Sequence, residues 1–260
     1  MGIRPAQGGI TPCPLISPVQ TAPKAKGIPM RVAIVENTSV THHGQVGVAL
    51  HEAAARIDLY KPWLDGRLPA LNSFDALVVF GGEQNALADH SHPYLPDLAG
   101  LMAEAGAQDH AVLGICLGSQ LMARGMGAQN QIDATPEFGW CEVSLTAEGQ
   151  TDPVLRHLPP RFPIFQWHSD TFSLPQGVTH LAQSALAASQ CFRAYRAAYA
   201  MQFHFEASRA VVADWTRTFG ALMESADPGW HANHPERSQR FGAEADAHGL
   251  ALARAWVQLV

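Results

Sequence analysis

The chain has few cysteines, and none of them stands close to another in the sequence. The 260 residues contain four, with neither a C-x-x-C pair nor the dense spacing of a disulfide-stabilised secreted domain: Cys13, Cys116, Cys141 and Cys191. This scarcity excludes the small disulfide-rich class of protein. It favours a reduced, cytoplasmic protein.

Long apolar runs and an excess of positive charge are also missing. No run approaches the length that spans a bilayer. The formal net charge of −6 at pH 7 argues against a general nucleic-acid binder and against an anionic membrane as partner. Residues 1–29 are rich in proline, glycine and threonine and lack the apolar segment of a signal peptide, so we expect a disordered tail. With 47% hydrophobic residues, the chain can bury a sizeable α/β core.

Apolar runs of strand type alternate with helical patterns in the first half of the chain. The strand patterns cover 31–35, 57–60, 74–80 and 111–115. The helical patterns cover 44–56, about 94–105 and 117 to about 127, and a loop is expected between Pro62 and Pro69. This alternation predicts an α/β fold with a doubly wound, mostly parallel central sheet flanked by helices.

The pattern changes after Gly127. We expect short strands joined by Pro/Gly turns, which would form a small antiparallel portion, at 140–145, 163–167 and 194–203. A helix is expected from Ala207 to about Glu224, then a polar loop over 227–238 and a last helix over about 243–260. We therefore predict one α/β domain over residues 30–225, followed by a C-terminal loop and helix extension over 226–260.

The segment 111–120 carries the clearest chemical signal. An apolar strand ends at Cys116, which stands between Gly114 and Gly118, and a helix-forming run begins at once. A nucleophile elbow has this order, because a sharp strand-to-helix turn exposes one side chain above a sheet. Glycines tolerate the strained backbone, and the N-terminus of the helix favours a thiolate. We interpret Cys116 as a nucleophile, although a buried structural cysteine also fits the short motif taken alone.

A cysteine nucleophile needs a base and a group that orients the base. A second apolar strand ends at His204, and Glu206 follows two residues later. In extended backbone, residues i and i+2 project to the same face, so the carboxylate can reach the imidazole and stabilise its cation. The alternative is a structural histidine followed by an acid at the start of the next helix. His168, which also follows an apolar strand, is a rival base.

The other histidines give no sign of a metal site. Three pairs lie in polar, loop-like surroundings where we expect solvated surface: His42 and His43, His90 and His92, and His231 and His234. Metal binding by His90 and His92 would lack a completing set of cysteines or carboxylates at ligand spacing. We expect neither a catalytic metal nor an organic cofactor.

An acyl-transfer site also needs N–H donors for the developing oxyanion. Gly81 and Gly82 follow the strand at 74–80, at the sheet edge where the carboxyl ends of parallel strands meet. The N–H groups of Gly82 and of Leu117, which directly follows the nucleophile, fit the two donor roles. A plain tight turn is the other explanation for the glycine pair.

Taken together, three segments resemble the class I glutamine amidotransferases: 80–82, 114–120 and 202–206. The likeness covers about residues 31–225. The likeness is greatest to stand-alone members similar to the glutaminase domain of GMP synthetase. The sequence motifs of that subgroup resemble those at 137–140, 167–172 and 174–177. The resemblance implies the flavodoxin-like fold of this family, with its sheet and helices as predicted above.

The resemblance also implies roles for single residues. It implies a catalytic triad of Cys116, His204 and Glu206. It implies an oxyanion hole formed by Gly82 and Leu117. It also implies a pocket for the glutamyl part of the substrate, formed by Gly81, Gln120, Ser169 and Asp170. Two positions depart from the family pattern. Phe205 stands where proline is usual, and Ser119 stands where a bulkier residue is common. Both departures leave the catalytic groups in place.

The implied activity is cleavage of a γ-glutamyl amide, glutamine to glutamate plus ammonia, through a cysteinyl thioester. No synthetase domain is expected after the last helix, so the ammonia would pass to a separate partner synthetase or another acceptor. A γ-glutamyl peptidase that acts on a small conjugate is the alternative activity. A non-catalytic binding or redox-sensing module is a third possibility, and the sequence leaves the substrate open.

Overall fold

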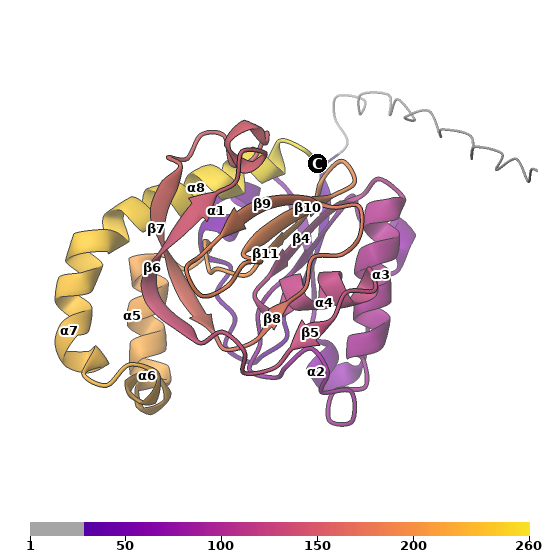
Figure 1. Ribbon diagram of the computed structural model, residues 1–260. Helices are drawn as coiled ribbons and strands as arrows, with labels where there is room; N and C mark the ends of the chain where they lie inside the picture. Colours follow the sequence, from indigo (N-terminus) through magenta and orange to yellow (C-terminus); the bar gives the residue numbers. More distant parts are fainter. Residues whose placement is uncertain (1–28) are drawn as a thin grey trace, which may run out of the picture.

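Five parallel strands form one half of the central sheet. The computed structural model describes residues 29–260, and in it these strands lie in the order β2-β1-β3-β4-β11. Their bounds are β1 (Arg31–Val35), β2 (Arg56–Tyr60), β3 (Ala76–Val79), β4 (Ala111–Ile115) and β11 (Ala198–Met201). The doubly wound, mostly parallel α/β fold is thereby confirmed (Figure 1). The predicted tail at 1–29 falls outside the described residues as far as residue 28.

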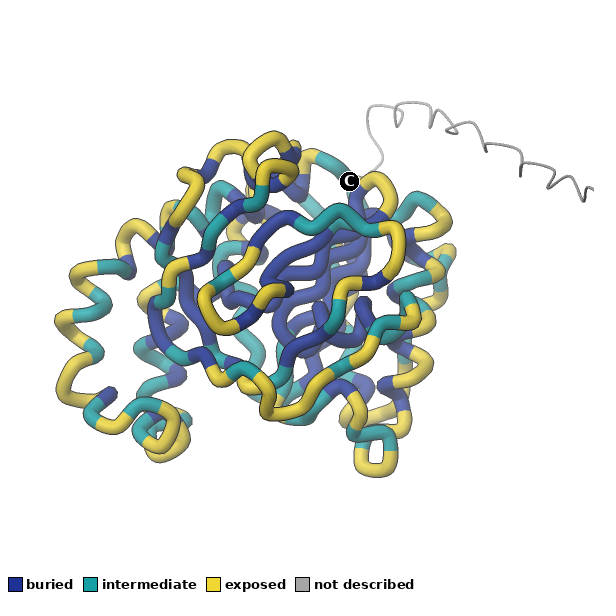
Figure 2. Tube along the Cα trace, viewed as in Figure 1, coloured by how far each residue is buried: buried dark blue, intermediate teal, exposed yellow. Residues whose placement is uncertain are grey.

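Helices cover both faces of these strands, because successive side chains of a strand point to opposite faces. Val32 and Ile34 of β1 belong to the apolar core beneath two helices, α1 (Gly44–Glu52) and α8 (Ala243–Val257). Ala33 and Val35 belong to the second core, beneath α3 (Leu95–Ala107) and α4 (Leu117–Gly125). Figure 2 shows the central strands buried along their length, while exposed segments lie on the outer helices and loops. Strands buried on both faces explain the continuous apolar runs in the sequence.

The other half of the same sheet is antiparallel. Its strands continue from β11 in the order β10 (Cys191–Ala194), β9 (Thr179–Gln183), β6 (Glu137–Leu145) and β7 (Arg161–His168). A separate two-stranded sheet pairs β5 (Asn130–Gln131) with β8 (Thr171–Phe172). The single strand predicted over 194–203 is wrong. The chain turns back there between β10 and β11, with Tyr195 at φ 51°, and no glycine or proline signals the turn.

The C-terminal part of the chain is more helical than predicted. The helix expected over 207–224 is divided at Phe219 into α5 (Arg209–Thr218) and α6 (Gly220–Ala226). The loop expected over 227–238 is wrong, because α7 (Trp230–Arg237) occupies most of it and a π-helical turn, η3 (Ser238–Gly242), joins it to α8. The sequence of α7 is mostly polar, so no apolar pattern predicted a helix there. Within α7 one side chain, that of Trp230, is buried.

The C-terminal helices pack on the same sheet as the rest of the chain. Helix α8 contacts α1 and β7, and the side chain of Trp256 is fully buried. The boundary at residue 225 stays a prediction. Short helical turns occupy three further loops: α2 (Pro62–Asp65), which corrects the loop expected between Pro62 and Pro69, η1 (Leu71–Ser73) and η2 (Gly149–Thr151). Across residues 29–260, none of the helices combines the length and apolar character needed to cross a membrane.

Candidate active site

Cys116 lies in the turn between β4 and α4, with the backbone conformation of a strained elbow. Its φ is 51° and its ψ is −110°, which is rare for a residue with a side chain. The Cys116 amide donates a hydrogen bond to the carbonyl of Met201, at 2.9 Å, which ties the elbow to the end of β11. This turn aims the sulfur out above the carboxyl ends of the parallel strands.

The two glycines of the elbow are required by space. A Cβ on Gly114 would lie 2.5 Å from the carbonyl oxygen of Gly118, and a Cβ on Gly118 would lie 2.1 Å from that of Val79. Real Cβ atoms do not approach backbone oxygen so closely, so any other residue would push α4 away from β3 and β4. The sequence motif G-x-C-x-G therefore reflects close packing of the helix onto the strands.

His204 and Glu206 follow β11 and form a buried pair. The Nδ1 atom of His204 lies 2.7 Å from the Glu206 Oε1 atom, and the two residues are 7% and 2% exposed. The His204 amide donates to the carbonyl of Phe165 at 2.8 Å, and the Gln45 amide donates to that of Glu206 at 3.0 Å. These bonds hold the segment between β7 and the start of α1, so both side chains have a fixed position.

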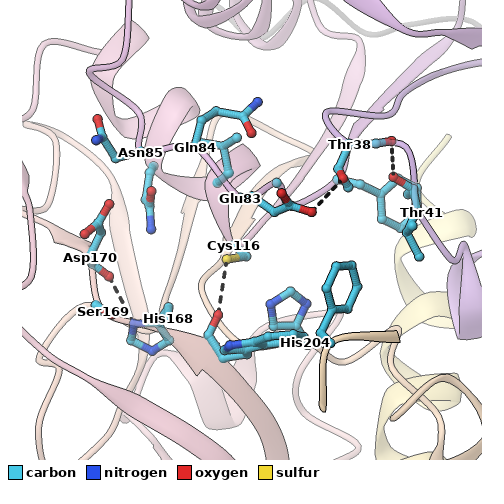
Figure 3. Close-up of a pocket in the computed structure, with 18 of the residues that line it drawn as sticks. Thr38, Thr41, Glu83, Gln84, Asn85, Cys116, His168, Ser169, Asp170 and His204 are labelled. Carbon is cyan, nitrogen blue, oxygen red and sulfur yellow. Dashed lines mark hydrogen bonds between the residues drawn. The ribbon is translucent and has the colours of Figure 1, made fainter. Parts of the chain in front are cut away.

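The sulfur of Cys116 and the imidazole of His204 meet beside Gly81. A Cβ built on Gly81 would lie 3.3 Å from the Cε1 atom of His204 and 3.9 Å from the Cys116 Sγ atom. Figure 3 shows both side chains facing the same cavity. Because Nδ1 is engaged by Glu206, the Nε2 atom of the ring is left for the sulfur.

The charge of His204 depends on its two neighbours. Burial favours the neutral imidazole, but the negative charges of Glu206 and of the Cys116 sulfur, with their hydrogen bonds, outweigh it. Together they raise the pKa of His204 well above its usual value. An imidazolium beside the sulfur is the protonation state in which His204 can act as an acid.

The two residues predicted to bind an oxyanion, Gly82 and Leu117, are close to each other at the elbow. Gly82 follows β3, and Leu117 is the first residue of α4, where helix geometry leaves the N–H without an intrahelical partner. Among residues 29–260, neither N–H donates to a protein acceptor. A Cβ on Gly82 would lie 3.0 Å from the Leu117 side chain, so the two residues are neighbours.

A cavity of about 440 Å³ opens above these groups. All nine residues named from the sequence line it: Gly81, Gly82, Cys116, Leu117, Gln120, Ser169, Asp170, His204 and Glu206. They come from loops after β3, β7 and β11 and from the elbow and first turn of α4 after β4, which are far apart in the sequence. The fold therefore brings together every predicted site residue, while their chemical roles stay predictions.

The residues proposed for the glutamyl pocket differ in exposure: Gln120 is buried, Gly81 and Asp170 are half-buried, and Ser169 is exposed. The side-chain amide of Gln120 donates to the Gln202 Oε1 atom at 3.2 Å. The Asp170 Oδ1 atom accepts a hydrogen bond from the Asp133 amide at 2.9 Å. Burial and the nearby Asp133 charge raise the pKa of Asp170, although the Asp133 amide and His168 oppose this. Loop 169–170 is thus fastened to the loop after β5.

His168 is close to the cavity, but its nitrogens face other partners. Its Nδ1 atom lies 3.0 Å from the carbonyl oxygen of Asp170, and its Nε2 atom lies 3.3 Å from the Glu137 Oε2 atom. Cys116 is near the same strand, since its sulfur lies 3.8 Å from the carbonyl oxygen of Trp167. The geometry therefore favours His204 over His168 as partner of the sulfur.

Four of the six histidines expected on the solvated surface, His42, His43, His92 and His234, are half-buried instead. His42 lines the cavity and lies 2.8 Å from the Asp214 Oδ2 atom on α5. His43 pairs with Glu36 at 2.8 Å. His234 stacks on Trp140, with ring centroids 6.1 Å apart. The contacts of His42 and His234 could not be predicted from the sequence, because Asp214 and Trp140 are distant from them in the chain. Within residues 29–260, no cluster of three or more His, Cys, Asp or Glu side chains could hold a metal ion.

Several cavity residues were missed from the sequence. They lie in the loops after β1 and β3 and on the α5–α6 turn: Thr38, Val40, Thr41, Glu83, Gln84, Asn85, Trp215, Phe219 and Leu222. The position of α5 directly after Glu206 was a usable signal, since a helix that follows a catalytic loop starts beside the site. The loop after β1 carried no such signal.

A comparison with protein-family models decides the family. Residues 43–213 match the model described as glutamine amidotransferase class-I. The chain belongs to this family. The match spans the parallel strands from β2 to β11, the elbow at Cys116 and the pair at 204 and 206.

Similar proteins carry related names. Over 179 residues the chain is 30% identical to a subunit of the glutamine-hydrolyzing GMP synthase of Natronomonas pharaonis, covering 68% of this chain and 88% of that protein. It is 29% identical over 180 residues to the glutamine amidotransferase-like protein YfeJ of Salmonella typhimurium, covering 62% and 75% of the two chains. A solved glutamine amidotransferase from Thermotoga maritima has a TM-score of 0.78 at 24% identity, over 88% of this chain and 97% of that chain. This last likeness shows the fold alone.

Proposed function

We propose that this amidotransferase-family protein hydrolyses γ-glutamyl amides through a thioester on Cys116. The observation that carries the proposal is the meeting of sulfur, imidazole and carboxylate. A single Cβ on Gly81 would touch His204 and lie 3.9 Å from the Cys116 sulfur, and His204 is held by Glu206 at 2.7 Å. Nucleophile, acid–base group and orienting group are the set that covalent acyl transfer needs.

In the first step the Cys116 sulfur attacks the amide carbon and a carbon–sulfur bond forms. The carbonyl oxygen becomes an oxyanion, which the N–H groups of Gly82 and Leu117 would bind. His204, as imidazolium, gives its proton to the amide nitrogen, the carbon–nitrogen bond breaks, and the amine leaves. A glutamyl thioester and a neutral imidazole remain.

In the second step the neutral His204 takes a proton from a water molecule that attacks the thioester. The carbon–sulfur bond breaks, and glutamate leaves. The sulfur is again a thiolate beside an imidazolium, so the site is restored. The net reaction consumes one water and one amide and yields one carboxylic acid and one amine, which become carboxylate and ammonium by proton exchange in water. Glu206 stabilises the imidazolium in both steps by its charge and its hydrogen bond.

The choice of a γ-glutamyl substrate rests on the relatives. Two of them are named for glutamine, one as a glutamine amidotransferase-like protein and one as part of a glutamine-hydrolyzing synthase. By analogy we propose that Gly81, Gln120, Ser169 and Asp170, which line the cavity, bind the glutamyl part. A separate synthetase that accepts the ammonia is proposed on the same ground, as is a cytoplasmic location.

The test is glutamate release by purified protein and by Cys116→Ala. The account expects release from L-glutamine or a γ-glutamyl amide by the unchanged protein and its loss in the variant. Cys141→Ala is the matched control, because Cys141 is half-buried, lies outside the cavity and should leave release unchanged. Glutamate release by Cys116→Ala would refute the mechanism, and no release by any form would favour a binding module.

A further inference from the structure

The wall of the cavity beside His204 is aromatic. The ring of Trp215 meets the His204 ring edge-on, with centroids 5.3 Å apart. Trp167 lies 5.5 Å from Trp215 and 5.8 Å from Phe219, measured between ring centroids. With Leu222, these three residues line the cavity, and we call the four of them the aromatic wall.

Two large apolar side chains stand open to solvent at the edge of this cavity. Leu222 of the aromatic wall is 54% exposed, and Ile132 in the loop after β5 is 41% exposed. Exposed apolar groups around a pocket with polar lining are typical of a surface that a ligand covers. The wall is therefore suited to an apolar part of a ligand that also enters the cavity.

Cys116 lies between two sides of the cavity. Asn85, Ser169 and Asp170 lie on one side of it (Figure 3). His204 lies on the other side, together with Glu83, Thr38 and Thr41. Under the proposed mechanism His204 protonates the leaving nitrogen, so the amine must lie on the His204 side. Whatever the amine carries then faces the aromatic wall.

Ammonia would leave that wall uncovered. The cavity volume of about 440 Å³ lies within the range of about 300–1,000 Å³ for pockets that enclose drug-sized ligands. Glutamine is much smaller than such ligands. The space beyond what glutamine fills and the exposed side chain of Leu222 in the aromatic wall beside His204 together point to a larger leaving group.

The charges around the cavity restrict that group further. Four carboxylates line the cavity, those of Glu83, Asp133, Asp170 and Glu206, and no lysine or arginine of residues 29–260 lines it. A carboxylate on the amine part would meet the Glu83 carboxylate on the His204 side of the cavity (Figure 3). It would find no guanidinium or ammonium to pair with, because the imidazolium of His204 is already paired with Glu206. An amine without an acidic group avoids this repulsion.

We propose that the preferred substrate is the γ-glutamyl amide of an amine with an aromatic or bulky alkyl group and no carboxylate. The apolar group lies against Trp215, Phe219 and Leu222, while the scissile nitrogen lies beside His204. This inference rests on the proposed function and names the substrate class of that same site.

The experiment compares kcat/KM for three probes: L-glutamine, γ-L-glutamyl-benzylamide and γ-L-glutamyl-L-phenylalanine. Benzylamine and ammonia are of similar basicity, so a difference between the first two reports binding of the ring rather than leaving-group chemistry. We expect kcat/KM for the benzylamide to exceed kcat/KM for each of the other two probes by about tenfold or more. This is the range of discrimination that a filled apolar subsite supplies.

Variants locate the effect. Phe219→Ala and Leu222→Ala should lower the benzylamide-to-glutamine ratio of kcat/KM by about fivefold or more, since each removes apolar contact on the amine side. Leu186→Ala is the control: Leu186 is 62% exposed, lies outside the cavity, and should leave the ratio as it is.

The failures can be told apart. Glutamine cleaved as well as the benzylamide, or a ratio unmoved by both variants, would overturn the substrate class and leave the amide-hydrolase proposal standing. A phenylalanine conjugate cleaved as fast as the benzylamide would overturn the charge argument. If no probe releases glutamate, the proposed function itself fails, and this inference falls with it.

Discussion

At the scale of single residues, the site depends on positions where no substitute fits. Cys116 accepts a φ of 51° because the glycines on either side let α4 approach β3 and β4. Within the elbow, the strained backbone is at the residue whose side chain lines the cavity. The motif could be recognised from the sequence because the close packing that requires its glycines involves residues only a few positions apart.

Gly118→Ala should therefore destabilise the protein. The added Cβ would lie 2.1 Å from the Val79 carbonyl oxygen, and overpacking of this kind costs about 1–3 kcal/mol. Gly100→Ala is the matched control, because a Cβ there meets nothing within 4 Å in the exposed middle of α3. Urea unfolding of the two variants checks this. A Gly118→Ala protein as stable as the control would contradict the close packing.

Glu206→Gln should change the pH dependence of catalysis in a stated direction. Glu206 helps to raise the pKa of His204 by its negative charge, and burial opposes it. Without that charge burial counts for more, so the pKa of His204 falls and the imidazolium is lost at lower pH. The basic limb of the kcat/KM profile, which reports free-enzyme groups, should shift to lower pH. A basic limb that does not shift would show that Glu206 does not control the protonation of His204.

At the scale of elements, the site is held by segments that meet from both halves of the chain. The loop after β1 contacts α5 through His42 and Asp214, and the start of α1 binds the backbone of Glu206. Helix α8 closes the same face of the sheet, where it packs on α1 and β7. The C-terminal segment thus contributes to the core that supports the site.

Trp256→Ala should test whether α8 belongs to the cooperative unit of the fold. The Trp256 side chain is fully buried, and truncation of a buried tryptophan costs about 3–5 kcal/mol. We expect a lower midpoint in urea with one transition seen by both fluorescence and circular dichroism. Gln258→Ala, an exposed neighbour on the same segment, is the control. Two separate transitions would instead mark residues 226–260 as an independent extension.

At the scale of the whole molecule, the parallel half was predictable and the rest was less so. Strands β1, β3 and β4 are buried on both faces, so their sequences are continuous apolar runs, and these runs predict strands. The turn at Tyr195 and the polar helix α7 are specified by tertiary contacts, such as the burial of Trp230, that no local pattern reveals. The triad and the two oxyanion residues could be named because they sit in short motifs at strand ends, whereas Gly81, Gln120, Ser169 and Asp170 were named from the family resemblance. The aromatic wall could not, because Trp215 and Phe219 look like ordinary helix residues until the fold places them beside His204.

The central claim is that Cys116 is the nucleophile of a γ-glutamyl site. The most direct measurement is peptide-mapping mass spectrometry after treatment with 6-diazo-5-oxo-L-norleucine, a glutamine analogue whose diazoketone alkylates a thiolate with loss of nitrogen gas. Cys141 and Cys191 serve as internal controls, because burial raises the pKa of Cys141 to about 11 and that of Cys191 well above its usual value. The account predicts one adduct, on Cys116, that excess γ-glutamyl substrate suppresses. An unmodified Cys116, or equal labelling of Cys141, would contradict it.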